Sequence, residues 1–466
     1  MTVHIIQIAY FIAAVLFIFG MKGMSSPLGA QKGIVWAGAG MVLATLVTFL
    51  DGNILNNTDH RTVNYVLMIV AIAIGGSLAW VSGKKVQMTD MPQMIALYNG
   101  MGGGAAAAIA ATQLIGGHIS SPLVGTLAVL GALIGSVSFS GSLIAYAKLQ
   151  GIMKGVFSLP KHQIITYGVL AVSVLMGLAL IALKGDSIPI MTPLVILFFA
   201  LALLFGVLMT LPIGGADMPV VISLFNALTG LAVAFEGFVL NNAAMIIAGT
   251  VVGAAGTLLT QLMAKAMNRS IAKLLSPPPP SAGGAQEVVG TMREIGAQDT
   301  AILMAYAQKV IIIPGYGMAV AQAQHKVWEL TQLLEEKGIE VKFAIHPVAG
   351  RMPGHMNVLL AEAGVNYERI FDLDEINPEF AQADVVLVIG ANDVVNPVAR
   401  TDKSSPIYGM PILNADMAKN VVVIKRGQGS GFSGIENALF YKDNTRMFYG
   451  GGQEAVNKLI HEVKQL

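Results

Sequence analysis

The sequence predicts a helical membrane domain of about nine spans, followed by a soluble α/β domain with a parallel sheet. Three observations predict this architecture. Hydrophobic residues make up 55% of the 466 residues and charged residues only 12%, whereas about a quarter of a soluble protein is charged. Residues 1–273 contain 12 Lys and Arg and 6 Asp and Glu, against 16 and 21 in residues 274–466. A run of prolines and glycines separates the two parts.

Nine apolar stretches within residues 1–273 approach the ~20 residues that cross ~30 Å of hydrocarbon. The first stretch has no basic start and no convincing cleavage site, so we expect a retained helix and not a signal peptide. The fourth is rich in Gly and Ala, which let helices approach closely inside a bundle. The expected spans are 4–21, 33–50, 65–82, 93–114, 122–146, 164–183, 188–211, 218–240 and 243–263.

Loop charges predict the orientation, because Lys and Arg resist translocation across the membrane. If nine spans end on a cytoplasmic C-terminal part, only Arg61 and Lys184 lie in outside loops. The inside loops then hold Lys22, Lys32, Lys84, Lys85, Lys148, Lys154, Lys161, Lys265, Arg269 and Lys273. We therefore expect a cytoplasmic C-terminal domain, and an error of one span would reverse this orientation.

A linker is expected at residues 274–288, because four consecutive prolines followed by Ser-Ala-Gly-Gly break both helix and strand. Beyond it, residues 289–466 are expected to form one domain. Short β-branched runs at 309–314, 340–346, 384–390 and 421–425 alternate with helix-period segments at about 319–336 and 356–364. This alternation predicts a parallel sheet with helices on both faces.

The composition excludes several classes of site. The chain has no cysteine, which excludes disulfides, thiolate catalysis, iron–sulfur clusters and cysteine-ligated zinc. No residues have metal-ligand spacing, so we expect no metal site. Of the eight histidines only His4 and His118 fall in or near spans, which argues against paired haem ligation. Neither part has the basic excess of a nucleic-acid-binding protein.

A glycine motif lies at the first expected strand-to-helix turn, directly after the strand at 309–314. Glycines there allow a tight turn and close backbone approach, and the helix N-terminus offers N–H groups to a pyrophosphate. The motif consists of Gly315, Tyr316, Gly317, Met318, Ala319 and Val320. It indicates a Rossmann-like dinucleotide site, although the glycines could also serve the turn alone.

The end of the second expected strand argues against NAD. NAD-binding domains of this kind usually carry Asp or Glu there for the ribose hydroxyl, whereas this strand ends in His346. Lys425 and Arg426 follow a later strand and supply the cations that a 2′-phosphate needs. The pattern favours NADP, with an exposed basic pair as the alternative. Asp393 is either a cofactor contact or a turn residue, and His355 is either a ligand group or an exposed histidine.

Polar residues within spans are informative because burying them in a membrane is costly unless they are paired. Glu236 is ionisable, and a role in a proton pathway competes with a position near the outer surface. Asp217 either caps the next helix or meets the soluble domain. The uncharged candidates either bond across helices or serve a pathway, and they are Asn99, Gln113, Asn226, Asn241, Asn242, Ser136, Ser138, Ser140 and Ser142.

The chain resembles the beta subunit of the proton-translocating NAD(P) transhydrogenase. The resemblance covers both parts of the chain in the expected order. It is carried by PGYGMAVAQAQ at 314–324, HPVAGRMPGHMNVLLAEA at 346–363, VIGANDVVNP at 388–397, GMPIL at 409–413, KR at 425–426, NTRM at 444–447, IGGADMPVV at 213–221 and KAMNRS at 265–270. Matches of this length are far more specific than the glycine motif.

The resemblance implies an oxidoreductase that transfers hydride between NAD(H), bound by an alpha partner, and NADP(H), bound by residues 289–466, while a proton crosses residues 1–273. Hydride passes directly between nicotinamides, so no catalytic acid or base is implied. The implied partners are alpha subunits that carry the NAD(H) domain and additional membrane helices, assembled as a dimer of such hetero-oligomers. The implied location is the bacterial cytoplasmic (inner) membrane.

The resemblance also implies the NADP contacts, with Lys425 and Arg426 near the 2′-phosphate. Besides Tyr316, they are Val348, Ala349, Gly350, Arg351, Met352, Pro353, Gly390, Ala391, Asn392, Asp393, Val394, Gly409, Met410, Lys425, Arg426, Gly427, Gln428, Gly429, Ser430, Gly431 and Phe432. The chain departs from the family at two points. Phe432 stands where tyrosine is usual, and residues 450–452 are three glycines where Gly-Asp-Ala is usual.

A further departure concerns the proton pathway. Asn99 stands where some members carry a membrane histidine thought to relay the proton, and an amide cannot titrate. Asn242 keeps the family's asparagine. We expect the titrating histidine on the alpha partner, with Asn99 and Asn242 orienting water beside it and Glu236 and Asp217 on the pathway.

A membrane transporter or channel gated by a nucleotide-sensing domain is the alternative class of function. Composition and topology fit it equally well. The chain lacks the discontinuous charged spans or filter-like segments of a solute pathway, and the long motif matches argue against it.

Overall fold

The computed structural model describes residues 2–24, 27–55, 60–116, 121–153, 157–183, 191–214, 217–268, 270–272, 290–352, 354–403, 405, 407–427 and 435–466. The chain divides into two compact units, and the main division falls after Thr260. The expected linker at 274–288 lies outside the described residues, and so does Lys273, the expected end of the membrane domain.

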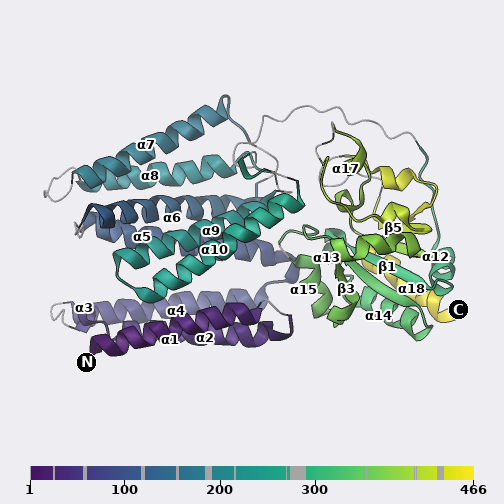
Figure 1. Cartoon of the computed structure of the whole chain (residues 1–466), viewed down its shortest axis with the longest axis horizontal. Helices are drawn as coiled ribbons and strands as arrows, with labels where there is room; N and C mark the ends of the chain where they lie inside the picture. The colour runs from purple at the N-terminus through teal and green to yellow at the C-terminus, as the bar shows by residue number, and fades with distance from the viewer. Residues whose placement is uncertain are drawn as a thin grey trace. The chain divides into compact units, whose positions relative to one another are not determined.

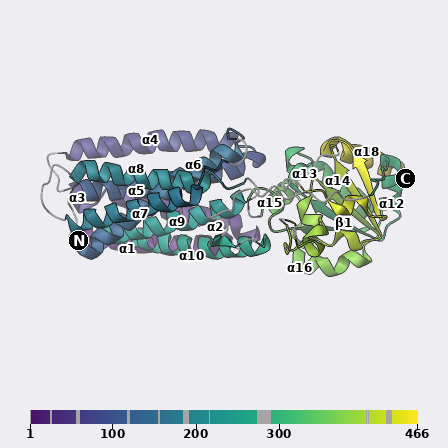
Figure 2. The same ribbon diagram turned by 90° about the horizontal axis from the view of Figure 1, so that it is seen from above.

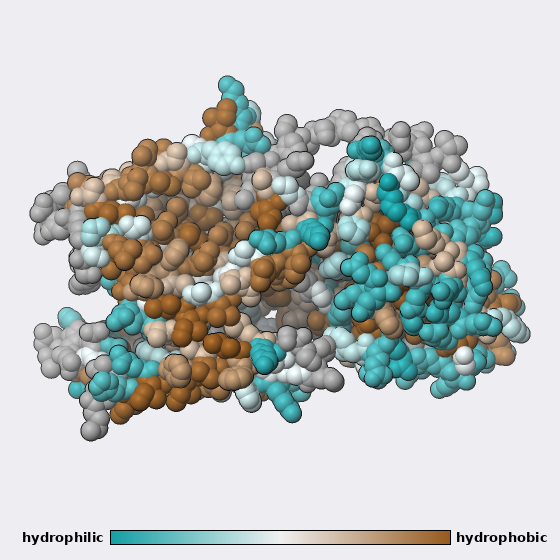
Figure 3. Space-filling view, in the orientation of Figure 1, coloured by the Kyte–Doolittle hydropathy of each residue, from teal (hydrophilic) through white to brown (hydrophobic). Residues whose placement is uncertain are grey.

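The first unit is a bundle of long helices that run along one direction (Figures 1 and 2). Nine helices among the described residues are long and apolar enough to cross a membrane, as predicted. They are α1 (Thr2–Met24), α2 (Pro27–Thr48), α4 (Arg61–Lys85), α5 (Met91–Ile115), α6 (Pro122–Leu149), α7 (His162–Ala182), α8 (Met191–Thr210), α9 (Met218–Val239) and α10 (Ala243–Ala266), with short α3 (Gly52–Leu55) and η1 (Met88–Asp90) between them. Hydrophobic side chains cover much of the visible surface of this unit (Figure 3).

Small residues let α5 and α6 pack closely, as expected for the Gly- and Ala-rich fourth span. A Cβ on Gly135 of α6 would lie 2.7 Å from the carbonyl oxygen of Gly103 on α5. The two backbones therefore touch at this level, which only glycine permits. α6 also packs against α7 and α8, so this helix is central to the bundle.

The second unit is built on a six-stranded parallel sheet with the order β3-β2-β1-β4-β5-β6. The four expected strands are present, and two further strands, β3 and β6, were not predicted. The strands are β1 (Lys309–Pro314), β2 (Glu340–Ile345), β3 (Ile370–Asp372), β4 (Val385–Ile389), β5 (Asn420–Lys425) and β6 (Thr445–Tyr449). β4 is buried along its whole length and β1 along all but its first residue, as in parallel sheets covered on both faces.

Helices cover both faces of this sheet. Hydrophilic side chains cover much of the visible surface of the second unit (Figure 3). α16, η3 and η6 contribute to one apolar core with β1, β4 and β5, while α14 packs on β2 and on α18, and α18 packs on α12. The helical elements are α12 (Ala297–Ala305), α13 (Tyr316–Val320), α14 (Gln324–Glu336), α15 (His355–Glu362), η2 (Tyr367–Arg369), α16 (Leu373–Ile376), η3 (Asn377–Gln382), η4 (Asp393–Val395), α17 (Val398–Thr401), η5 (Ala415–Met417), η6 (Ala438–Tyr441) and α18 (Gly452–Gln465).

The prediction of one continuous helix over 319–336 is wrong. α13 ends at Val320, and α14 begins at Gln324. Between them Gln322 takes a left-handed conformation with φ of 49°, which ends a right-handed helix. The glycine motif therefore contains a helix of only five residues, which begins directly after Gly315.

Candidate functional site

The chain order of the sheet reverses between the neighbouring strands β1 and β4. β2 and β3 continue outward from β1, and β5 and β6 continue outward from β4. In open parallel sheets, ligands bind in the crevice at the carboxyl ends of the strands where the order reverses. The turns after β1, β2, β4 and β5 hold most of the predicted cofactor residues, so the fold gathers them at this edge.

Glycines join the turn after β1 to the turn after β4. The Gly315 N–H donates to the Ile389 carbonyl and the Gly317 N–H to the Gly390 carbonyl, both at 2.9 Å. A Cβ on Gly315 would collide with Gly390, which has φ of 68°. Residues with side chains at these positions would push the two turns apart. The glycines therefore serve close backbone approach as well as the turn.

Arg351, after β2, stacks on the aromatic ring of Tyr316, after β1. The guanidinium carbon lies 4.3 Å from the ring centroid. A cation and an aromatic face at one sheet edge suit a ligand that carries phosphates and flat rings. Pro353, the last predicted contact in this turn, lies outside the described residues.

His355, at the start of α15, is 1% exposed, so the alternative of an exposed histidine is wrong. Its Nδ1 accepts a hydrogen bond from the Arg351 N–H at 3.1 Å. Burial, with a contribution from the Arg351 charge, lowers the pKa of His355 to about 4. The ring is therefore neutral near pH 7 and holds the Arg351 turn in place.

His346 directly follows β2. NAD-binding domains usually carry Asp or Glu at this position to bind the ribose. Its ring nitrogen Nε2 donates to the Pro411 carbonyl at 2.7 Å, and its Nδ1 accepts from the Val348 N–H at 3.2 Å. Burial lowers the pKa of His346 to about 4. The residue fixes the segment that contains the predicted contacts Gly409 and Met410. Sequence reasoning missed this role, because nothing local indicates the partner.

Lys425 ends β5, and its ammonium lies 4.7 Å from the centroid of the Phe440 ring. Burial lowers the pKa of Lys425, and the charge of Glu436 opposes this effect. Arg426 and Gly427 are exposed. Two cations at this strand end can meet a 2′-phosphate. The remaining contacts predicted here, Gln428, Gly429, Ser430, Gly431 and Phe432, lie outside the described residues.

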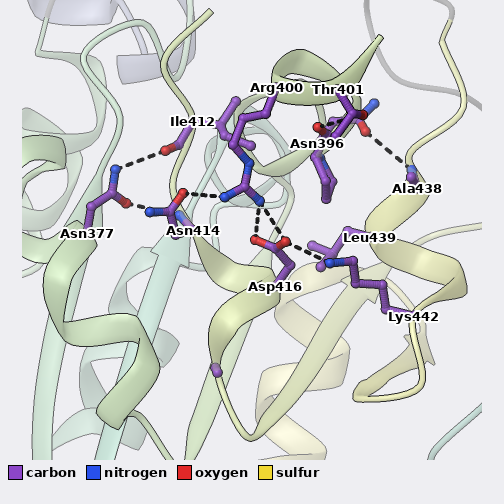
Figure 4. A network of polar contacts seen from close by, with 12 residues as sticks. Asn377, Asn396, Arg400, Thr401, Ile412, Asn414, Asp416, Ala438, Leu439 and Lys442 are labelled. Atoms are coloured by element: carbon purple, nitrogen blue, oxygen red, sulfur yellow. Dashed lines mark hydrogen bonds and ion pairs between the residues drawn. The ribbon is translucent and has the colours of Figure 1, made fainter.

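A polar network joins Arg400 and Lys442 to Asn414 and Asp416, which follow the 409–410 segment in the chain (Figure 4). Arg400 donates to both carboxylate oxygens of Asp416 at 2.6 Å and to Asn414 at 3.0 Å, and Lys442 donates to Asp416 at 2.7 Å. Burial would raise the pKa of Asp416, but the bonds from Lys442 and Arg400 outweigh it and lower the pKa. The sequence analysis did not single out these residues.

In the helical unit, a polar cluster joins α5, α6 and α9. The side-chain amide of Asn99 donates to Ser142 at 3.1 Å. The Ser138 hydroxyl lies 2.5 Å from that of Thr229 and donates to the Phe225 carbonyl at 2.9 Å. The cluster connects three helices. Its hydroxyl and amide groups can form a continuous series of hydrogen bonds.

Glu236 lies two turns after Thr229 on α9, ~10 Å along the helix. It is 0% exposed, so it is enclosed by other parts of the bundle, and whether it lies near the outer membrane surface stays a prediction. Neither carboxylate oxygen has a hydrogen-bond partner among the described residues. A Cβ on Gly131 of α6 would collide with this carboxylate, so glycine makes room for it. A carboxylate at this depth needs a proton or a partner cation.

The structure does not bring the other two predicted pathway residues into this cluster. Asn242 accepts from the Met245 N–H at 3.1 Å and so caps the start of α10. Asp217 lies in the turn before α9 and is partly exposed. Both remain predictions as pathway residues.

Comparisons with known proteins cover both units. A family model described as NAD(P) transhydrogenase beta subunit matches residues 6–462. Two curated relatives from Rhodospirillum rubrum, both named NAD(P) transhydrogenase subunit beta, are each 44% identical over 474 aligned residues, which cover 99% of this chain and 99% of the relative. The name implies an alpha-subunit partner, and nothing in these matches favours a gated transporter. The chain belongs to the NAD(P) transhydrogenase beta-subunit family and is an integral membrane part of a proton-translocating oxidoreductase.

Proposed function

We propose that the α/β unit binds NADP(H), while the alpha partner binds NAD(H). The observation that carries this proposal is the pair Lys425 and Arg426 at the carboxyl end of β5, on the same sheet edge as the turns after β1 and β4. His346 occupies the end of β2 with both ring nitrogens bonded to main chain. That strand end therefore lacks the carboxylate that an NAD site needs for the ribose 2′-hydroxyl.

The residues of this chain hold and orient the nucleotide. Arg351 and Tyr316 offer a cation and an aromatic face, Lys425 and Arg426 neutralise the 2′-phosphate, and the turn at 390–394 supplies main-chain groups and Asp393. The nicotinamide ring, when bound, accepts or releases the hydride. No side chain of this chain is required as an acid or base for that transfer.

The test of the NADP(H) proposal is calorimetry of NADP⁺ and NAD⁺ on the purified complex of both subunits, with Lys425→Ala and Arg426→Ala. We expect each variant to weaken NADP⁺ binding by about 10- to 100-fold, because a charge-assisted bond to phosphate is lost. NAD⁺ binding should not change. Lys458→Ala is the matched control, since this lysine is exposed on α18 and pairs with Glu454. Equal losses for both nucleotides would overturn the proposal.

We further propose that the proton crosses the bundle between α5, α6 and α9, through the Asn99 cluster and Glu236. Asn99 cannot titrate, so it orients hydroxyl groups or water, and the alpha partner supplies a titrating histidine. Asn99→His should transfer that role to this chain. The measurement is proton conduction by vesicles that contain this chain without its partner. Normal conduction by the unmodified chain alone would contradict the role of the partner.

The excess of basic residues in the expected inside loops supports a cytoplasmic α/β unit in a bacterial inner membrane. In this proposal residues 1–273 form the proton-translocating domain, 274–288 the linker and 289–466 the nucleotide domain, within a dimer of alpha and beta assemblies. Protease accessibility of residues 290–466 in right-side-out and inverted vesicles tests the orientation. Cleavage only in right-side-out vesicles would reverse it.

A further inference from the structure

Two asparagines next to the predicted cofactor contacts are almost fully buried. Neither of them is itself a predicted contact. Asn396 follows the turn after β4 and is 0% exposed, and Asn437 precedes η6 and is 1% exposed. A buried amide is costly unless it is hydrogen-bonded. Each of the two amides meets this need by bonding across to the segment that contains the other.

Asn437 bonds to the turn after β4. Its Nδ2 donates to the main-chain carbonyl of Asn392 at 3.0 Å and to the Asn392 side-chain oxygen at 2.9 Å. Its Oδ1 accepts from the Leu439 N–H at 2.9 Å and so caps η6. Asn392 directly precedes Asp393, so this amide fixes the turn that presents Asp393.

Asn396 bonds in the opposite direction. Its Nδ2 donates to the Glu436 carbonyl at 3.1 Å. Its Oδ1 accepts from the N–H groups of Val398 at 3.2 Å and Ala438 at 3.3 Å, the second of which Figure 4 draws. The two segments are therefore joined by reciprocal bonds, and neither can shift without breaking several of them.

Residues 435–440 also form the surroundings of Lys425. The Phe440 ring lies under its ammonium at 4.7 Å, and the Glu436 charge acts on it. One short segment thus contacts Lys425 through Phe440 and is bonded to the Asp393 turn through Asn437.

We propose that Asn396 and Asn437 are positioning residues that couple the Asp393 turn to Lys425 through residues 435–440, so that the two parts of the nucleotide site shift together. The inference rests on the proposed NADP(H) site and adds a property to it. Because the two parts shift together, a change in one of them alters the affinity of the whole site for the nucleotide. An enzyme that couples nucleotide binding to another process requires this property.

A double-mutant cycle tests the coupling. The binding of NADP⁺ is measured by calorimetry on the complex of both subunits. Three variants are compared, namely Asp393→Asn, Lys425→Ala and the two combined. The set is measured first in the otherwise unmodified chain and then in a chain that also carries Asn437→Asp. Asp at 437 keeps the acceptor for Leu439 and loses the donor to Asn392. In the unmodified chain, we expect the combined loss of affinity to differ from the product of the single losses by about fivefold or more. With Asn437→Asp it should equal that product within about twofold.

The control is Asn444→Asp, which removes a donor of the same kind. Asn444 donates to the carbonyls of Asp416 at 3.2 Å and Ala418 at 2.7 Å. It directly precedes β6 and so lies at the amino ends of the strands, whereas the proposed nucleotide site lies at their carboxyl ends. We expect it to preserve the coupling. Should Asn437→Asp fold poorly, Asn396→Asp removes only the bond to Glu436 and should abolish the coupling in the same way.

The outcomes separate this inference from the proposed function. Coupling that survives both Asn437→Asp and Asn396→Asp, or that is absent from the unmodified chain, overturns the positioning role. Single variants at Asp393 and Lys425 that leave NADP⁺ binding unchanged would instead overturn the NADP(H) site itself.

Discussion

Two buried polar sites, one in each unit, differ in how their groups are bonded. In the α/β unit, Asn396, Asn437 and Asp416 are each bonded to several partners. In the bundle, neither oxygen of Glu236 has a hydrogen-bond partner among the described residues. An unpaired carboxylate is more expensive to bury than an amide, yet it is the group without a partner. The comparison teaches that full bonding suits residues that hold shape, whereas an unpartnered acid fits the proton-pathway role that we propose for Glu236.

The largest effect is expected at Glu236. Glu236→Gln keeps the shape and removes the titrating group, so proton uptake into vesicles that contain the whole complex should fall by about 100-fold or more. The affinity for NADP⁺ should not change. A pH-sensitive dye inside the vesicles reports the uptake, with NADPH and NAD⁺ outside.

The control for Glu236 is Ser136→Ala. Ser136 is also buried without a side-chain hydrogen-bond partner among the described residues, but a hydroxyl does not titrate. Its variant should pump normally. Unchanged pumping by Glu236→Gln would break the comparison, because it would make Glu236 structural.

Asp416 is expected to give the next largest effect, on stability. Asp416→Ala leaves Arg400 and Lys442 without their shared carboxylate and should destabilise the α/β unit by about 2–4 kcal/mol. Hydrogen exchange of residues 290–466 measures the loss. Glu454→Ala, which breaks an exposed pair with Lys458, should cause no measurable loss of stability, because solvent screens such pairs. Similar exchange in both variants would refute the importance of the network.

Acid should destabilise the α/β unit as the pH falls from about 6.5 to about 4. The folded pKa values of His346 and His355 are about 4, below the unfolded value of 6.5. Between these two pH values the unfolded chain binds more protons than the folded chain. The free energy of unfolding therefore decreases as the pH decreases. Each histidine contributes on the order of 1–3 kcal/mol across the window.

The test is the slope of unfolding free energy against pH, from hydrogen exchange in the complex. His346→Gln should reduce that slope, and a second substitution, His355→Gln, should reduce it again. A slope that neither substitution changes would show that these rings are not held neutral.

The smallest effect is expected within the Asn99 cluster. Ser142→Ala removes one hydrogen bond from Asn99 and should destabilise the bundle by about 0.5–1.5 kcal/mol, measured as a shift in thermal unfolding. Ser140→Ala is the control, because among the described residues the Ser140 hydroxyl bonds only the Ser136 carbonyl of its own helix. It should shift less, and an equal shift would argue that the cluster adds nothing to helix packing.

Patterns set by neighbouring residues predicted most of the fold. Spans of the bundle depend on local hydrophobicity, and buried strands such as β1 and β4 are continuous β-branched runs. β3 was missed because it has only three residues, and β6 because Thr445 and Arg446 interrupt its apolar character. The break before α14 was missed because Gln322, and not glycine, takes the left-handed conformation.

The sequence by itself determined the two-part architecture, the strand ends that hold the predicted nucleotide contacts and the family, because these depend on local composition and contiguous motifs. Only the tertiary structure decided the burial of Glu236 and His355, the bond of His346 to Pro411 and the joining of Asn396 to residues 436–438. These depend on which distant segments meet. No local pattern records that meeting, since burial and hydrogen bonding are completed by residues tens of positions away in the chain.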